Sequence, residues 1–313
     1  MESDILVAGE CLVDFIPDRP GPLETVEQFR RRAGGAPANV AVRLAGLGPA
    51  PLLWTRLGAD PFGRYLEATL QEHGIPGDFV VADEEAKTTL AFVAHDDDAD
   101  RGFTFYRERT ADTRFQPRTV PDEVLEALSW VAFGGVCLTD EPAREAMLDL
   151  ATRARRNDCQ TFFDPNARPE LWPDGFSEAL ELGCARASVV KATPEDLAEA
   201  GIEGSPDELL DAVLDMGPHT AILTLGSEGA VARARREAPW GPATAEHEGF
   251  DVEVVDTTGA GDAFAAGLLR GLADGRTLGE TLAFGNAAAA VTTTSEGAMS
   301  ASVSRESVEA LLD

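Results

Sequence analysis

Short apolar runs alternate with amphipathic segments along most of this sequence. The runs are typical of buried strands, whereas the segments between them repeat apolar positions every three to four residues, as helices do. Strands are predicted at 4–8, 51–57, 130–134, 161–164, 188–191 and 220–225. Helices are predicted at 38–47, 62–72, 142–156, 177–185, 194–200 and 205–216. The alternation predicts an α/β fold in which a central, mostly parallel sheet is flanked by helices on both faces.

Two stretches, at about 10–33 and 87–113, break this alternation. They contain β-rich segments such as TTLAFVAH and GFTFYRER without intervening helices, so we expect a small β-sheet beside the core, placed as a lid. No long serine- or glycine-rich linker is present, and the chain, 1–313, is therefore predicted to be a single domain with the lid inserted in it. The run HDDDAD at 95–100 is predicted to be a solvated hairpin turn.

Charge and composition narrow the classes of function. The 313 residues carry 55 acidic and 26 basic side chains, for a net charge of −29, which argues against nucleic acid and anionic membranes as partners. Lysine occurs only at Lys87 and Lys191, and this scarcity with the acid excess predicts adaptation to a salt-rich cytoplasm. The four cysteines are scattered without disulfide or zinc-site spacing. With no basic leader and no membrane-length apolar run, we expect a cytoplasmic protein.

The segment 252–272, VEVVDTTGAGDAFAAGLLRGL, carries the clearest candidate chemistry. It predicts an apolar strand that ends at Asp256, a glycine turn, and a helix that begins near Gly261. The N–H groups of Gly259, Ala260 and Gly261 would form an anion-binding nest, with Asp262 at its rim as a general base. The alternative interpretation is a glycine turn whose aspartate only complements the helix dipole. A Walker A loop needs a lysine that is missing here, and a dinucleotide fingerprint needs glycine where Phe264 stands.

Two motifs together resemble the ribokinase-like (phosphofructokinase B) family of sugar kinases. DTTGAGDAF is similar to the C-terminal signature of that family, and GGAPAN at 34–39, followed by an amphipathic helix, is similar to its N-terminal counterpart. Both occur in the expected order, and the resemblance covers essentially the whole chain. It implies a ribokinase-like α/β fold with a β-sheet lid, and an ATP- and Mg²⁺-dependent transfer of a phosphoryl group to a sugar hydroxyl.

The resemblance also assigns roles to residues. It gives Asp262 the role of catalytic base, and Gly259, Ala260 and Gly261 that of the anion hole. The side chains or backbone expected to bind the sugar are Asp14, Gly34, Gly35, Asn39, Arg107 and Arg168. For Asp14, the alternative is an aspartate that only belongs to the lid hairpin.

The nucleotide and metal sites follow from the same resemblance. The nucleotide is expected at Thr224, Gly226, Gly229 and Asn286, with Gly297-Ala298 beside the adenine. Helix packing is the alternative role for Asn286. The family's N-x-x-E motif is replaced by Thr193-Pro194-Glu195-Asp196, so Asp196 would act on magnesium through phosphate or water. Asp256, with Thr258, matches positions near a monovalent cation site, which implies potassium.

Three further segments indicate the kind of sugar. GECLVDFIPD, FTFYRERTAD and FDPNARPELWPD resemble the fructokinase branch, so fructose is the expected acceptor, at O1 or O6. Arg107 and Arg168 could instead grip the carboxylate of 2-keto-3-deoxygluconate, as in the kinases of that sugar acid. Those kinases tend to carry a second tyrosine where Phe105 stands, which favours a neutral ketose. Ribose and nucleosides are weaker options.

The same residues argue against functions of other classes. A dinucleotide-dependent oxidoreductase is excluded because no GxGxxG follows the first strand. A catalytically inactive sugar- or nucleotide-binding regulator would typically have lost the base, whereas Asp262 is present. Family members often dimerise through their lid sheets, which predicts a homodimer here.

Overall fold

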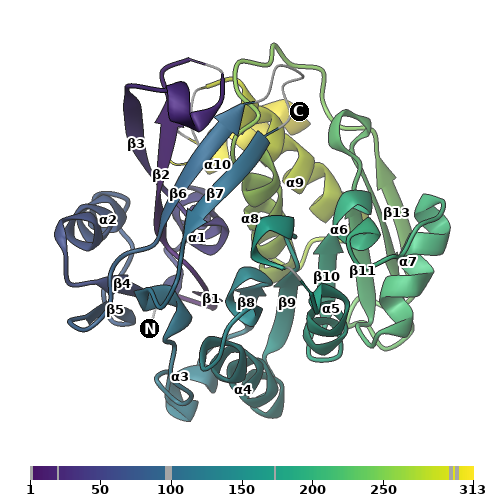
Figure 1. The fold of residues 1–313 in the computed structure, drawn as a ribbon. Helices are drawn as coiled ribbons and strands as arrows, with labels where there is room; N and C mark the ends of the chain where they lie inside the picture. The colour runs from purple at the N-terminus through teal and green to yellow at the C-terminus, as the bar shows by residue number, and fades with distance from the viewer. Residues whose placement is uncertain (1–2, 20, 96–100, 173, 296–298, 300–302) are drawn as a thin grey trace.

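The computed structural model describes residues 3–19, 21–95, 101–172, 174–295, 299 and 303–313 (Figure 1). Within these residues a nine-stranded sheet has the order β13-β12-β11-β10-β9-β8-β1-β4-β5. Its strands are β1 (Ile5–Ala8), β4 (Leu52–Gly58), β5 (Val80–Asp83), β8 (Trp130–Gly134), β9 (Gln160–Asp164), β10 (Val189–Ala192), β11 (Thr220–Thr224), β12 (Ala230–Ala234) and β13 (Ala243–His247). Pairing is parallel from β5 through β11 and antiparallel for β12 and β13.

Two layers of helices cover the sheet because its buried strands present apolar side chains to both faces. In β1, Ile5 and Val7 enter one core, and Leu6 and Ala8 enter the other. The first core includes side chains of α1 (Ala36–Leu47), α2 (Pro61–Glu72), α8 (Ala260–Ala273), α9 (Leu278–Thr293) and α10 (Arg305–Leu312). The second includes side chains of α3 (Asp122–Leu125), α4 (Ala143–Arg156), α5 (Phe176–Cys184), α6 (Pro194–Ala198) and α7 (Pro206–Asp215).

A separate four-stranded sheet stands beside the large one (Figure 1). Its order is β3-β2-β6-β7, with β2 (Leu12–Pro17), β3 (Phe29–Gly34), β6 (Leu90–His95) and β7 (Arg101–Tyr106). All four strands come from the two β-rich stretches of the sequence. Strand alternation turns Leu12, Asp14 and Ile16 toward a cavity, while Phe15 stacks on Phe92 on the other face.

Every strand and helix predicted from the alternation is present, with ends shifted by a few residues at most. The strand predicted at 252–256 is wrong. This segment has no regular secondary structure and pairs with no strand among the described residues, and Val254 and Val255 are each 58% exposed. The N–H groups of Val255 and Asp256 instead donate to the carbonyl of Thr293, at the end of α9. Residues 96–100 of the predicted hairpin turn, and Gly297-Ala298, lie outside the described residues.

No helix in the described ranges combines the length and apolar character that crossing a membrane requires.

Candidate active site

A cavity of about 270 Å³ joins the two sequence motifs. Its walls come from the start of α1, the start of α8, the loop after β9 and the inner face of the small sheet. Its polar lining comprises Glu10, Asp14, Asn39, Asn166, Arg168, Asp256, Thr258 and Asp262, and its apolar lining includes Phe103 and Phe105. Because the carboxyl ends of parallel strands meet at one edge of a sheet, this is where an α/β fold places a ligand.

Asn39 and Asp262 form the direct link between the motifs. The Asn39 Nδ2 group donates a hydrogen bond to Asp262 Oδ2 at 2.7 Å. Burial raises the pKa of Asp262, while the Asn39 hydrogen bond, and then the charges of Lys191, Arg168 and Arg43, oppose that rise. The result is a carboxylate that is more basic than an exposed aspartate, which suits it to take a proton from a hydroxyl.

The turn before α8 fixes the position of Asp262. Gly259 has the left-handed conformation, with φ of 78°, and precedes the first helical residue, Ala260. The N–H of Ala260 donates to the Thr257 carbonyl at 3.2 Å, so in this structure it closes the turn. Gly261 is exposed on the first turn, where helical N–H groups lack intrahelical acceptors. Of the three predicted anion-binding amides, that of Ala260 is thus already engaged.

Lys191 lies close to this turn and was missed in the sequence. A Cβ added to Gly261 would be 3.9 Å from Lys191 Nζ. The buried ammonium pairs with Asp164 Oδ2 at 3.0 Å, across the ends of β10 and β9. Burial lowers the pKa of Lys191, but Asp164, Asp196 and Asp262 outweigh that effect and raise it. The protein therefore keeps a fixed positive charge beneath the start of α8.

Gly34 and Gly35, the two glycines predicted to bind the sugar, have no room for a side chain. A Cβ at Gly34 would lie 2.0 Å from Asp14 Oδ2, and one at Gly35, whose φ is 97°, would lie 2.5 Å from the Glu10 carbonyl. Gly35 lines the cavity, and Gly34 lies behind Asp14. Burial raises the pKa of Asp14 to about 7, with Arg168 opposing the rise and Asp262 adding to it.

Arg168 reaches the cavity from the loop after β9. Its Nη1 group donates to Asn166 Oδ1 at 2.8 Å and to the Ala167 carbonyl at 2.7 Å, and its guanidinium lies over the Phe103 ring, 5.3 Å from the centroid. Asn166 holds this arrangement with a φ of 40°. Neither Asn166 nor the Phe103 wall was predicted, although the alternation of β7 turns Phe103 and Phe105 to the same face.

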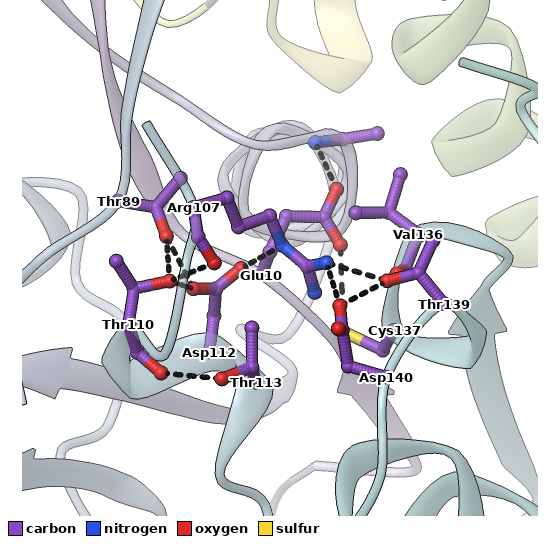
Figure 2. Close-up of polar contacts among 11 residues, drawn as sticks. Glu10, Thr89, Arg107, Thr110, Asp112, Thr113, Val136, Cys137, Thr139 and Asp140 are labelled. Carbon is purple, nitrogen blue, oxygen red and sulfur yellow. Dashed lines mark hydrogen bonds and ion pairs between the residues drawn. The ribbon is translucent and has the colours of Figure 1, made fainter. Parts of the chain in front are cut away.

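Arg107 does not line the cavity, contrary to the prediction that it flanks the sugar. Figure 2 shows the polar contacts that hold it instead. It is buried and donates from Nε to Asp112 Oδ2 at 2.7 Å and from Nη1 to Asp140 Oδ2 at 2.8 Å. The reason is that β7 ends at Tyr106, so the alternation that turns Phe103 and Phe105 inward stops before Arg107.

The predicted nucleotide residues lie at the end of β11, in the turn after it and on α9. Thr224 ends β11, Gly226 (φ 60°) begins the short 3₁₀ helix Gly226–Glu228, and Gly229 (φ 85°) follows it. A Cβ at Gly229 would come within 1.9 Å of the His247 carbonyl. Asn286 is buried and donates to the Leu282 carbonyl of its own helix, and its nucleotide role stays a prediction.

The two predicted metal residues accept different hydrogen bonds. Asp196 accepts backbone hydrogen bonds on both oxygens, from Ala167 and Thr193, and forms a capping box at α6. These hydrogen bonds hold its carboxylate in place, and its action on magnesium through water or phosphate stays a prediction. Asp256 lines the cavity and accepts hydrogen bonds on Oδ1 from the N–H and hydroxyl of Thr258. Carboxylate and hydroxyl oxygens of this kind suit a hard cation.

Comparison with known proteins agrees with the sequence motifs and the fold. The model of the pfkB family carbohydrate kinases matches residues 2–305. Fructokinase-1 of Oryza sativa subsp. japonica is 34% identical over 309 residues, covering 95% of this chain and 94% of the relative. The structure of a fructokinase with bound ATP from Xylella fastidiosa superposes with a TM-score of 0.87 at 30% identity, covering 100% and 98% of the two chains. The structure of a Vibrio cholerae O395 fructokinase double mutant bound to fructose, ADP and potassium has a TM-score of 0.83 at 27% identity, covering 100% and 99%. The chain belongs to the pfkB family of carbohydrate kinases.

Proposed function

We propose that this protein is an ATP-dependent fructokinase in which Asp262 is the catalytic base. The observation that carries the proposal is the Asn39–Asp262 hydrogen bond on the floor of the cavity. Asp262 would take the proton of a sugar hydroxyl while the first turn of α8 stabilises the phosphoryl group that this hydroxyl attacks. Lys191 adds a positive charge on the same side, and phosphoryl transfer needs mainly such positioning and charge stabilisation.

The polarity of the cavity favours a neutral sugar over a sugar acid. Asp14 and Asp262 supply carboxyl groups that accept hydrogen bonds from hydroxyls, whereas Arg168 is the one cationic side chain among the described residues that line the cavity. With Arg107 held by Asp112 and Asp140, the two-arginine grip on a carboxylate is not assembled. Asn39 Oδ1 is buried and has no hydrogen-bond partner among the described residues, so it is available to a hydroxyl. The fructokinase names of the relatives support fructose within this class.

ATP would bind along Thr224, Gly226 and Gly229, on the other side of the α8 N-terminus from the sugar. Magnesium accompanies ATP and neutralises its phosphates, and Asp196 would hold part of its water shell. Potassium would bind at Asp256 and Thr258, whose carboxylate and hydroxyl oxygens suit a hard cation. The potassium-bound form of the Vibrio fructokinase supports potassium as the ion. We place the enzyme in the cytoplasm, since its substrates are those of a metabolic kinase.

Two properties of the surface extend the proposal. The outer face of the small sheet exposes 63% of Tyr106, and we assign that sheet, which would act as a lid, as the homodimer contact. Sedimentation at high salt tests this assignment, and a monomer would contradict it.

The net charge of −29 with two lysines supports halophilic behaviour, so activity should fall as KCl is diluted from molar levels.

The decisive assay incubates the purified protein in high KCl with Mg-ATP and one acceptor at a time, namely fructose, 2-keto-3-deoxygluconate, ribose or adenosine, and follows ADP release. The proposal predicts turnover of fructose, and ³¹P NMR of the product then separates phosphorylation at O1 from that at O6. Turnover of the sugar acid alone would contradict the neutral-sugar assignment. Sugar binding without turnover of any acceptor would indicate an inactive binding protein.

A further inference from the structure

A buried polar network joins the end of the small sheet to the core (Figure 2). Arg107 follows β7, Asp112 lies in the 3₁₀ turn Ala111–Thr113, and Asp140 lies after the 3₁₀ turn Val136–Leu138 that follows β8. The Arg107 guanidinium connects these segments, because Nε donates to Asp112 and Nη1 donates to Asp140 and to the Thr139 hydroxyl. The network therefore fixes the chain that leaves the small sheet against the loop beyond β8.

Asp112 is itself held from two sides. The hydroxyls of Thr89 and Thr110 both donate to Asp112 Oδ1, and Asp112 is 1% exposed. Thr89 comes directly before β6, the neighbour of β7 in the small sheet. Both strands of the β6–β7 hairpin are thus tied to the core through one arginine. None of these side chains lines the sugar cavity.

Glu10 connects this network to the cavity. Its Oε1 accepts a hydrogen bond from the N–H of Ala36 at 3.2 Å, and the Cys137 thiol donates to its Oε2 at 3.7 Å. Glu10 is 3% exposed, and the positive charge of Arg107 stabilises its ionised form against the larger cost of burial. Figure 2 shows the Glu10 carboxyl group together with Cys137 and Arg107.

Ala36 is the first residue of α1, and the catalytic contacts follow from that helix. The Asn39 N–H donates to the Gly35 carbonyl at 2.9 Å, and the Asn39 side chain holds Asp262. A shift of the Gly35–Ala36 turn would therefore move the amide that orients the base. One continuous set of contacts runs from Arg107 through the Thr139 hydroxyl to the Val136–Cys137 turn, and from the Cys137 thiol to Glu10. It continues from Glu10 through the Gly35–Ala36 turn and Asn39 to Asp262.

We propose that Glu10 and Arg107 are positioning residues, which together set the place of the Gly35–Ala36 turn and, through it, of Asn39 and the sugar. This inference rests on the proposed kinase function only in its kinetic test, because the KM for the sugar can be measured only if the protein is a kinase. It assigns Arg107 an indirect role instead of a contact with the substrate.

The chain offers a matched control for the arginine. Arg153 on α4 is also buried and donates to two carboxylates, Asp122 and Asp149, but it lies outside the cavity lining. We expect Arg107→Met to raise the KM for the sugar by about tenfold and to leave the KM for ATP within about twofold. Arg153→Met should lower the melting temperature to a similar extent without changing either KM. An equal rise in sugar KM for both variants, or none for Arg107→Met, would overturn the proposal.

Glu10 variants test the second half of the chain of contacts. Glu10→Gln keeps an oxygen that accepts the Ala36 N–H and should stay close to the parent in sugar KM, whereas Glu10→Ala should raise it by about tenfold. In the double variant Glu10→Ala/Arg107→Met, the effects should be far from multiplicative, because both substitutions release the same turn. Multiplicative effects would indicate that Arg107 acts independently of Glu10.

Amide hydrogen exchange provides a readout that needs no substrate. In the apoprotein, Glu10→Ala and Arg107→Met should each speed exchange in the peptide spanning 35–42, and Arg153→Met should not. If no acceptor is phosphorylated, the kinase proposal fails while this measurement still decides the inference. Unchanged exchange at 35–42 in both variants would overturn it even if the enzyme is active.

Discussion

Asn39 Nδ2 lies 2.7 Å from Asp262 Oδ2, although the two residues are 223 positions apart in the chain. This bond brings the two family motifs into one site. Asn39 orients the carboxylate, and its own Oδ1 remains available to a sugar hydroxyl. The sugar hydroxyl and the base can therefore be aligned by one side chain.

A substitution at Gly34 tests whether sugar binding depends on the position of the Asp14 carboxyl group. We expect Gly34→Ala to raise the KM for the sugar by about tenfold or more, because the added Cβ would lie 2.0 Å from Asp14 Oδ2 and displace that carboxyl group. The control is Gly279→Ala on α9, where a Cβ would meet nothing within 4 Å. Steady-state kinetics compare the two. A parental sugar KM in Gly34→Ala would show that the position of Asp14 does not matter.

The pH dependence of the rate should report Asp262. Its pKa is raised from 3.8 by burial, and the base must be ionised, so kcat/KM should fall on the acid side at a pH above the usual aspartate range. Lys191 opposes that rise, and Lys191→Met should therefore move the acid limb to still higher pH. Lys87→Met, at the other lysine of the chain, serves as the control. An acid limb unmoved by Lys191→Met would show that this ammonium does not act on the base.

Asp14 should make stability depend on pH. Its pKa is raised to about 7 in the fold, so between about pH 4 and 7 the folded state binds more protons than the unfolded state, and stability falls as pH rises through this window. Asp14→Asn cannot ionise and should be more stable than the parent at pH 8 by about 1 kcal/mol or more, with little difference at pH 4. Urea unfolding at both pH values measures this, with the exposed Asp18→Asn as control. A gain that is equal at both pH values would contradict the assignment.

Arg168 should bind the neutral sugar directly. We expect Arg168→Gln to raise the KM for fructose by about tenfold, the usual effect of losing a charged hydrogen-bond donor. Arg155→Gln is the control, since Arg155 is exposed and donates to the carbonyl of Ala185, away from the cavity. Loss of activity on 2-keto-3-deoxygluconate with fructose turnover unchanged would instead show that Arg168 recognises a carboxylate.

The sequence predicted the elements well because their patterns are local. The apolar positions of β1 alternate between two cores, and α1 and α8 begin at glycine turns, all of which can be read from a few consecutive residues. The strand predicted at 252–256 failed because pairing depends on a neighbouring strand, and the N–H groups of Val255 and Asp256 meet the end of α9 instead.

The site was harder to predict wherever a side chain's direction depends on tertiary contacts. Arg107 is one residue beyond the end of β7, and Asp112 and Asp140 determine where its guanidinium points. Glu10 and Lys191 were not predicted as site residues because neither belongs to a recognised motif. Both nevertheless stand at or just past the carboxyl ends of parallel strands, β1 and β10, where α/β folds gather their functional groups.

The central claim is that Asp262 is the base of a fructokinase, and one measurement tests it directly. Fructose phosphorylation by Mg-ATP is compared between the parent, Asp262→Asn and the exposed-site control Glu253→Gln, with fructose binding followed by calorimetry. We expect Asp262→Asn to lose about 10³-fold in kcat while it retains its fold and binds fructose, and Glu253→Gln to match the parent. Turnover of fructose by Asp262→Asn at close to the parental rate would contradict the account.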